Sequence, residues 1–308
     1  MRNYRTLLVL AIFGLGLALG FGCGVDYTAP QRYTGDMYFV SGLLREGEPV
    51  SLNNPIRIGK VAQIGDTVDL LSMLIPARVY LTDSLTQQTV ELTPAPGQIG
   101  KYLFFYDSSL SFIPKEKQTY TLRIEIEGYD KIITAHTTIP AKFEVESNSG
   151  FTADSSASYP EMKADRIGAD FPLKMKAEVM PGERYVVLYY RSYCLENWQD
   201  VEYSDSYLFK FSDKPEDEEE YEDPSTGYPR KMDVYNTSIP AAEGRISDKT
   251  YGSMFAFYGR YEMTIYSIDP NYYKYLYKPE GFNQGGVVNG IGCFGSVSGT
   301  KLYTRIVK

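Results

Sequence analysis

Apolar and polar residues alternate along most of the chain, and this period of two restricts the possible folds more than any other feature. The clearest example is YTLRIEIE, Tyr120–Glu127, in which every second residue is apolar or aromatic. Successive side chains of a β-strand point to opposite faces, so this pattern predicts a strand with one buried and one polar face. Gly128-Tyr129-Asp130 predicts a turn, and KIITAHTTIP predicts the returning strand.

Similar alternation predicts further short strands in both halves of the chain, separated by glycine, proline and small polar residues. In the first half these strands are DMYFVSGLL, ARVYLTD, TVELTP and KYLFFYD. In the second half they lie at Leu173–Val179, Tyr185–Cys194, Tyr207–Ser212, Met254–Tyr258 and Arg260–Ile268.

One segment, DPNYYKYLYK, predicts a helix instead. Asp269 is a favourable N-cap and Pro270 suits the first helical position, while Tyr272, Tyr275 and Leu276 fall on one helical face. Many short strands, frequent turns and a single short helix near the C-terminus predict an all-β chain. We expect two β-sandwich-like domains, of which the N-terminal one is of the immunoglobulin or transthyretin type.

A change of composition indicates where the two domains meet. The stretch ESNSGFTADSSASYP, Glu146–Pro160, is rich in serine and other small residues, which is typical of a connector or a long loop. The predicted organisation is a lipoprotein signal peptide at 1–22, a tether at 23–35, an N-terminal β-sandwich at 36–141, a linker or long loop at 142–170 and a C-terminal β domain at 171–308.

The first residues have the order of a bacterial export signal. Arg2 and Arg5 precede an uncharged, glycine-rich apolar run, Thr6–Gly22, which is shorter than the roughly 20 apolar residues that a membrane span needs. Cys23 follows directly, as in the lipobox of lipoproteins, whose cysteine is lipidated and becomes the first residue. Leu19 stands four residues before the cysteine, whereas the usual box has leucine three before it. The alternative is a plain signal peptide that happens to end in a cysteine.

Lipidation of Cys23 would make the lipid bilayer a partner of this chain. The mature protein would then be anchored to a membrane without spanning it. Gly24 follows the cysteine in place of the aspartate that retains such proteins in the inner membrane of some bacteria. We therefore expect an outer-membrane location, on its periplasmic or its surface face.

The remaining cysteines form an even pair. With lipid on Cys23, Cys194 and Cys293 are left, and exported proteins meet an oxidising environment. Alternation places Cys194 on the apolar face of RYVVLYYRSYC and Cys293 on the apolar face of GIGCFGSVS. A Cys194–Cys293 disulfide is therefore a candidate, and two separate buried thiols are the alternative.

Charge and motif content argue against several classes of function. The net charge is −8, with no basic patch, so nucleic acid is not an expected partner. His136 is the only histidine, and its strand position favours an exposed side chain over a role in a Ser–His site. One histidine and two apolar-face cysteines do not predict a zinc site, and the phosphate-binding glycine motifs of cofactor sites are missing. We expect no enzymatic activity, metal or cofactor.

The acidic segment DKPEDEEEYED, Asp213–Asp223, is the most unusual local feature. It contains eight acidic residues and one lysine. A calcium-binding loop or a site for a basic partner is one interpretation, but the spaced Asp/Asn pattern with a central glycine is missing. A solvated loop between strands is the favoured interpretation.

The order of several short motifs resembles an uncharacterised outer-membrane lipoprotein family of Bacteroidota-type bacteria, domain of unknown function 4249. Near the C-terminus these motifs are YYKYL, Tyr272–Leu276, and NGIGCFG, Asn289–Gly295. In the first half they are VSGLL at Val40–Leu44, ARVYLTD, the Gly100-Lys101-Tyr102 turn, TYTLRIEIEG and TTIP. The resemblance implies an outer-membrane location beside a nutrient-uptake receptor of the TonB-dependent type. It implies no established activity, and hence no catalytic residues.

The expected function is that of an outer-membrane-anchored, non-enzymatic binding or accessory module. The 28 tyrosines suit half-buried β surfaces and leave room for a binding role. One alternative is a fimbrillin-like pilus subunit, cleaved near Arg32 or Arg45. A second is a surface hydrolase that uses paired carboxylates, whose geometry the sequence does not reveal.

Overall fold

The computed structural model describes most of the chain from Met37 to its C-terminus. The described residues are 37–61, 76–95, 102–146, 149–180, 186–196, 202, 204, 232–241, 244–248, 254–277 and 285–308, with the backbone alone at 232–241 and 244–248. They belong to one compact unit, Met37–Lys308. Cys23, Arg32, the predicted strand Tyr207–Ser212 and the acidic segment Asp213–Asp223 lie outside the described residues.

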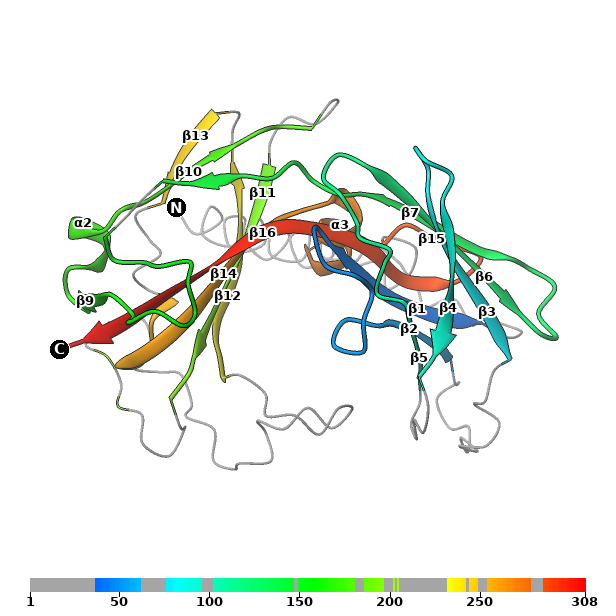
Figure 1. Ribbon diagram of the computed structural model, residues 1–308, viewed down its shortest axis with the longest axis horizontal. Helices are drawn as coiled ribbons and strands as arrows, with labels where there is room; N and C mark the ends of the chain where they lie inside the picture. Colours follow the sequence, from blue (N-terminus) through cyan, green and yellow to red (C-terminus); the bar gives the residue numbers. More distant parts are fainter. Residues whose placement is uncertain are drawn as a thin grey trace, which may run out of the picture. The chain divides into compact units, whose positions relative to one another are not determined.

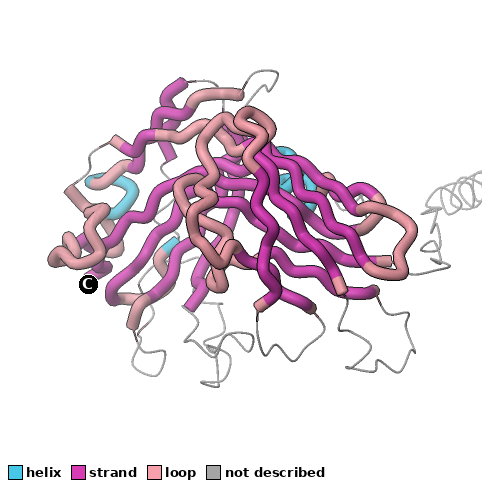
Figure 2. The backbone as a smooth tube through the Cα atoms, turned by 45° about the vertical axis from the view of Figure 1, so that its right-hand side comes forward, coloured by secondary structure: helices cyan, strands magenta, loops and turns pink. Residues whose placement is uncertain are grey.

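Short strands dominate this unit, so the all-β prediction is confirmed (Figures 1 and 2). The strands and helices described are β1 (Tyr38–Arg45), β2 (Ile56–Lys60), β3 (Ala77–Asp83), β4 (Thr89–Pro94), β5 (Leu103–Tyr106), β6 (Thr119–Ile126), β7 (Ile133–Thr138), β8 (Glu144–Val145), β9 (Glu161–Lys163), α2 (Ile167–Asp170), β10 (Leu173–Ala177), β11 (Val186–Cys194), β12 (Met232–Ala241), β13 (Gly244–Asp248), β14 (Gly259–Ile268), α3 (Pro270–Tyr277), β15 (Val287–Val288) and β16 (Ile291–Val307).

Most strands belong to one sheet, in the order β12-β11-β14-β16-β1-β2-β5-β4-β3-β6-β7-β15, with β9 also paired to β16. A second, small sheet has the order β13-β10-β8. The 17-residue strand β16, red in Figure 1, pairs in parallel with β1 through its first half and antiparallel with β14 through its second. It therefore joins strands of both predicted domains in one sheet, and the division into two domains stays a prediction.

The N-terminal part of the large sheet curls until its last strand returns to β16. β15 pairs with β7, and the residues just before it, Gly285 and Gly286, form bridges to Cys293 of β16. The Phe294 N–H donates to the Gly285 carbonyl at 3.0 Å. The inner faces of these strands thus enclose a common core.

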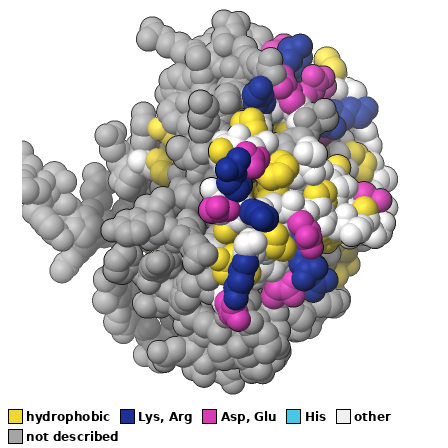
Figure 3. Space-filling model, turned by 90° about the vertical axis from the view of Figure 1, so that its left-hand side faces the viewer, with side chains coloured by type: hydrophobic (Ala, Val, Ile, Leu, Met, Phe, Trp, Pro, Cys, Tyr) yellow, Lys and Arg dark blue, Asp and Glu magenta, His cyan; other side chains and the backbone are white. Residues whose placement is uncertain are grey.

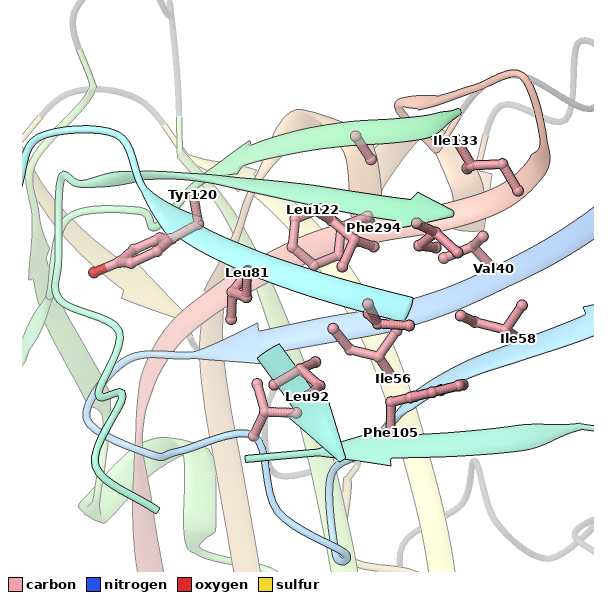
Figure 4. Packing of buried hydrophobic residues seen from close by; sticks show 14 of the residues in the cluster. Val40, Ile56, Ile58, Leu81, Leu92, Phe105, Tyr120, Leu122, Ile133 and Phe294 are labelled. Atoms are coloured by element: carbon pink, nitrogen blue, oxygen red, sulfur yellow. The ribbon is translucent and has the colours of Figure 1, made fainter. Parts of the chain in front are cut away.

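That core contains the apolar faces predicted by alternation. Tyr120, Leu122, Ile124 and Ile126 of β6 are all buried, which confirms the predicted faces of YTLRIEIE. Phe294 of β16 lies among these side chains and is fully buried (Figure 4). Removal of this apolar surface from water, at roughly 25 cal/mol per Å², is the main stabilisation that the strands receive.

A second core lies between the small sheet and the inner faces of β11 and β14. Leu173, Met175 and Ala177 of β10 point into it, as predicted. Tyr189 on the opposite face of β11 is buried as well, and its ring packs edge-on against Tyr272 of α3 at 6.3 Å between centroids. β11 is therefore covered on both faces, which an alternating pattern does not predict.

Three local features differ from the sequence expectations or add to them. Residues Met254–Tyr258 are not a strand: Met254 to Phe257 are buried in the second core, and the Ala256 carbonyl accepts from the Ser204 N–H. The segment expected to be a linker contains β8, β9 and α2. The helix at 270–277 is confirmed as α3. None of the described helices is long and apolar enough to cross a membrane.

Candidate functional site

A cavity of about 420 Å³ lies where α3 meets the sheet, and it is the best candidate for a functional site in the described part of the chain. Its walls come from the end of β7 and the residues after it, the end of β14, the start of α3 and the start of β11. This volume falls within the range of about 300–1,000 Å³ that is usual for small-molecule pockets.

Asp269 holds the first turn of α3 in place. Its Oδ1 accepts hydrogen bonds from the backbone N–H groups of Tyr272 and Ser296, both at 3.0 Å. The Tyr272 bond is the N-cap contact predicted from the DPNYY sequence. Ser296 belongs to β16, so the same carboxyl group also fastens the helix to the sheet. Burial raises the pKa of Asp269 above its ordinary value, although the hydrogen bonds that it accepts oppose that shift.

Side chains from the C-terminal region cover the outer edge of β7. The amide of Asn289 donates to the Ile132 carbonyl at 2.8 Å, and the amide of Asn271 donates to the His136 carbonyl at 2.8 Å. The Ser296 hydroxyl donates to the Thr138 carbonyl at 2.9 Å. A free strand edge is a template for pairing with other chains, so these side-chain caps protect carbonyl groups that β15 does not reach.

The cavity is lined by apolar and polar side chains in similar numbers, and three of its charged or titratable side chains are exposed. Val187 and Ile268 are buried side chains of the wall. His136 and Lys274 line the cavity as exposed residues. Glu178, on the other side, pairs with the Lys117 ammonium at 2.7 Å, and this hydrogen bond raises the pKa of Lys117. Buried apolar side chains together with exposed charges of both signs suit an amphiphilic ligand.

His136 lies on the exposed face of β7, as the sequence predicted. Within the described part of the chain, its ring has no hydrogen bond or ion pair to a serine, cysteine or carboxylate. A general base needs such a partner within about 2.6–3.2 Å to activate a nucleophile. The described residues also contain no cluster of three or more His, Cys, Asp or Glu that could hold a metal ion.

The structure contradicts the Cys194–Cys293 disulfide. Both side chains are buried, as expected, but both are free thiols. Cys194 is the register partner of Tyr261 in β14, and Tyr261 is in turn the register partner of Thr304 in β16. Thr304 and Cys293 are eleven residues apart in the same strand, roughly 36 Å at about 3.3 Å per residue. A disulfide needs Cα atoms within about 7 Å, so the bond cannot form.

Three residues of the site, Thr137, Asn271 and Ser296, were not singled out by the sequence. Their partners are far away in the chain; for example, Thr137 contacts Asp269 across 132 positions. The polar character of Ser296 in the stretch IGCFGSV was a weak signal, because Ser298 and Thr304 of the same strand are buried as well.

Another face of the molecule carries both acidic and basic side chains. Figure 3, which views the side with α2 and the end of β16, shows basic and acidic side chains intermingled. Ion pairs here join Arg166 to Asp170 and Arg305 to Glu161. Exposed pairs of this kind contribute little to stability, about 0–1 kcal/mol.

Fold and site together define a curled, mostly β protein with a cavity beside one capped helix. The chain belongs to the DUF4249 family, described as a domain of unknown function, whose sequence model matches residues 25–302. No curated protein matches. A crystal structure of a DUF4785 family protein from Legionella pneumophila subsp. pneumophila str. Philadelphia 1 has 11% identity and a TM-score of 0.24. That match covers 75% of this chain and 52% of the other, so this chain spans about half the length of that protein.

Two motifs that first indicated the family have structural roles in this site. In NGIGCFG, Asn289 covers the Ile132 carbonyl, Phe294 fills the first core and Gly295 lies against α3. A Cβ atom on Gly295 would be 2.8 Å from Cβ of Tyr272, so glycine is needed for the close approach of the helix. The helix motif and the strand motif are therefore two sides of one contact.

Proposed function

We propose that this protein is an outer-membrane lipoprotein, anchored by acylated Cys23, whose folded part is a non-enzymatic binding or accessory module. The order of charged, apolar and glycine–cysteine segments at the N-terminus supports the anchor. The observation that supports binding is the cavity beside α3. It is of ligand size and combines buried apolar and polar side chains, and Oδ1 of its one buried acid is occupied by backbone N–H groups.

The cavity favours a small amphiphilic ligand. Its buried wall offers apolar contact with Val187 and Ile268, and its mouth offers His136, Lys274 and Glu178 for polar groups. Such a module would bind a ligand and deliver it to a nutrient-uptake receptor of the TonB-dependent type. The DUF4249 resemblance supports this partner, and no catalytic role is proposed for any residue.

The position of Arg45 weighs against the pilus-subunit alternative. Arg45 ends β1, a strand with β16 on one side and β2 on the other. Its guanidinium lies over the ring of Tyr266, 5.8 Å from the centroid. Cleavage after Arg45 would remove an internal strand of the sheet together with the core residue Val40. Arg32 lies outside the described residues.

Two measurements test the proposal. In fractionated cells, the parent should sediment with outer membranes and the Cys23→Ser variant should not; equal sedimentation of both would refute the anchor. Cross-linking of intact outer membranes should capture a single receptor. A ladder of self-adducts would instead indicate a pilus subunit, and capture of no partner would refute the accessory role.

A further inference from the structure

Three buried polar side chains form a continuous line beneath the first turn of α3. Oγ1 of Thr137 in β7 lies 2.7 Å from Oδ2 of Asp269 and 2.7 Å from Oγ of Ser296 in β16. The Ser296 Oγ in turn lies 2.9 Å from the carbonyl oxygen of Thr138. Thr137, Asp269 and Ser296 are each at most 3% exposed, so water does not complete these contacts.

Counting hydrogens shows that one proton is missing from this line if Asp269 is ionised. The line contains three oxygen–oxygen contacts, and each needs one hydrogen between its two atoms. Thr137 and Ser296 supply one hydroxyl hydrogen each. Thr137 cannot donate both to Asp269 and to Ser296, and the Thr138 carbonyl has no hydrogen to give. With an ionised Asp269, one of the three short contacts would have no hydrogen, and two oxygen lone pairs would face each other inside the protein.

A protonated carboxyl group supplies the third hydrogen. Its Oδ1 already accepts from the N–H groups of Tyr272 and Ser296, so Oδ2, next to Thr137, is the oxygen that can carry the proton. Oδ2 also lies 3.3 Å from the Asn271 N–H, from which the hydroxyl oxygen of a neutral acid can still accept.

We propose that Asp269 is protonated in the folded protein and is the residue that sets the specificity of the cavity. Its proton begins a relay in which Asp269 donates to Thr137, Thr137 donates to Ser296 and Ser296 donates to the Thr138 carbonyl. Because Asp269, Thr137 and Thr138 also line the cavity, the relay leaves that part of its wall without charge. The cavity then selects a ligand whose inner end is uncharged. This last step rests on the proposed binding function, whereas the protonation does not.

The hydrogen-bond partners of Asp269 are neutral backbone and side-chain groups. The titratable or charged groups on the surrounding elements are His136 on β7, Tyr272, Tyr273 and Lys274 on α3, Cys293 on β16, Glu178 across the cavity, and Arg191 on β11 and Arg45 on β1, which both act on Tyr272. Among the described residues none of them forms an ion pair with Asp269. Burial without a counter-charge favours the neutral form of a carboxyl group.

The contrasting carboxyl group is Asp107, which is also buried. Its two oxygens accept from the Ser109 N–H at 3.0 Å, the Ser109 hydroxyl at 2.6 Å and the Phe112 N–H at 2.9 Å. All three partners are donors and none needs a proton from the acid. Asp107 is therefore as inaccessible to solvent as Asp269, but it lies closer to the surface and has the surroundings of an ionised carboxylate.

The test compares asparagine variants at these two sites in the full-length chain. Asparagine resembles a neutral carboxyl group: its amide can donate to Thr137 while its oxygen accepts from the Tyr272 and Ser296 N–H groups, and it gives up only the longer 3.3 Å contact from the Asn271 N–H. Asp269→Asn should therefore unfold at the temperature of the parent in mildly acidic buffer and at a higher temperature in alkaline buffer. Asp107→Asn should lower the midpoint in both, because its amide would face N–H donors. A midpoint for Asp269→Asn well below that of the parent at both pH values would overturn the proposal.

Infrared difference spectroscopy gives a second, direct readout. The parent at mildly acidic pH should show the carbonyl band of a protonated buried carboxyl group, and Asp269→Asn should lack it. A parent spectrum without that band would also overturn the proposal, whether or not the variant folds. Neither measurement needs a lipid anchor or a ligand. Failure of the Cys23 fractionation experiment would therefore leave this result unchanged.

Discussion

The ring of Phe294 in β16 lies directly against Gly42 in β1. A Cβ atom at position 42 would be 3.1 Å from Cδ2 of Phe294 and 3.2 Å from Cγ1 of Ile56. The two residues are register partners in the parallel pair of β1 and β16. Each belongs to a motif that resembles the family, VSGLL in the first half and NGIGCFG near the end. The glycine of one motif thus makes room for the aromatic ring of the other.

Changes at either residue should destabilise the fold by different mechanisms. Phe294→Ala leaves a cavity in the first core and should lower the free energy of unfolding by about 3–5 kcal/mol. Gly42→Val forces two methyl groups against the ring and should cost about 1–3 kcal/mol. Ser41→Ala, one residue away on the outer face of β1, is the matched control. Denaturant unfolding measures all three, and a Phe294→Ala protein as stable as the control would contradict this packing.

The two free thiols should be unreactive in the folded protein. Burial raises the pKa of Cys194 to about 11, and it also raises the pKa of Cys293. The thiolate is the reactive form, so almost none is present at neutral pH. With Cys23 replaced by serine, a thiol reagent should label no cysteine in buffer and both cysteines in denaturant without reductant. A peptide pair linked through Cys194 and Cys293 in non-reducing mass mapping would show instead that the two thiols are bonded to each other.

Asn271 should contribute more to the attachment of α3 to the sheet than the exposed residues of the same helix do. Its side-chain amide donates to the His136 carbonyl at 2.8 Å and to the Phe294 carbonyl at 3.0 Å. Asn271→Ala leaves both carbonyls without these donors, which should cost about 1–3 kcal/mol. Lys274→Ala on the same helix should cost less than about 0.5 kcal/mol. Hydrogen exchange of the α3 amides should rise in the first variant only, and equal rates would count against this role.

Alternation along the chain predicts the buried face of strands that are covered on one side, but it does not predict which strands are covered on both sides, such as β11, or where strands meet. In β6 and β10 it identified the inward residues correctly, because a strand covered on one face has an unambiguous period of two. The same reasoning placed Cys194 and Cys293 inward and then paired them incorrectly. The face on which a residue lies does not give its position along the strand direction, and these two cysteines lie far apart in that direction.

The site was predictable only where its contacts are local. Asp269 was identified as an N-cap because its Tyr272 partner is three residues away. Its contacts to Thr137 and Ser296 depend on strand pairing between residues 132 and 27 positions apart, which no local pattern encodes. The cavity forms from the same long-range pairing, so neither its position nor its charge could be derived from the sequence.

The buried carboxyl groups Asp107 and Asp269 should give opposite pH dependences of stability. Burial alone would raise the pKa of Asp107, but the hydrogen bonds from Ser109 and Phe112 outweigh it and the net shift is downward. A depressed folded pKa contributes stability that is complete above the unfolded pKa and is lost as pH falls through the folded value. The raised pKa of Asp269 has the reverse sign: its contribution is complete below the unfolded pKa and is lost as pH rises through the folded value.

The measurement is the free energy of unfolding as a function of pH for the parent and for Asp107→Ala and Asp269→Asn. The difference between the parent and Asp107→Ala should shrink as the pH falls below about 4, because the parent then loses the ionised form that Ser109 and Phe112 stabilise. The difference between the parent and Asp269→Asn should instead grow in favour of the variant as the pH rises, because only the parent must then ionise a buried acid. Parallel curves for the parent and Asp269→Asn would mean that Asp269 titrates alike in the folded and unfolded chain, and its burial would then make no contribution to the pH dependence of stability.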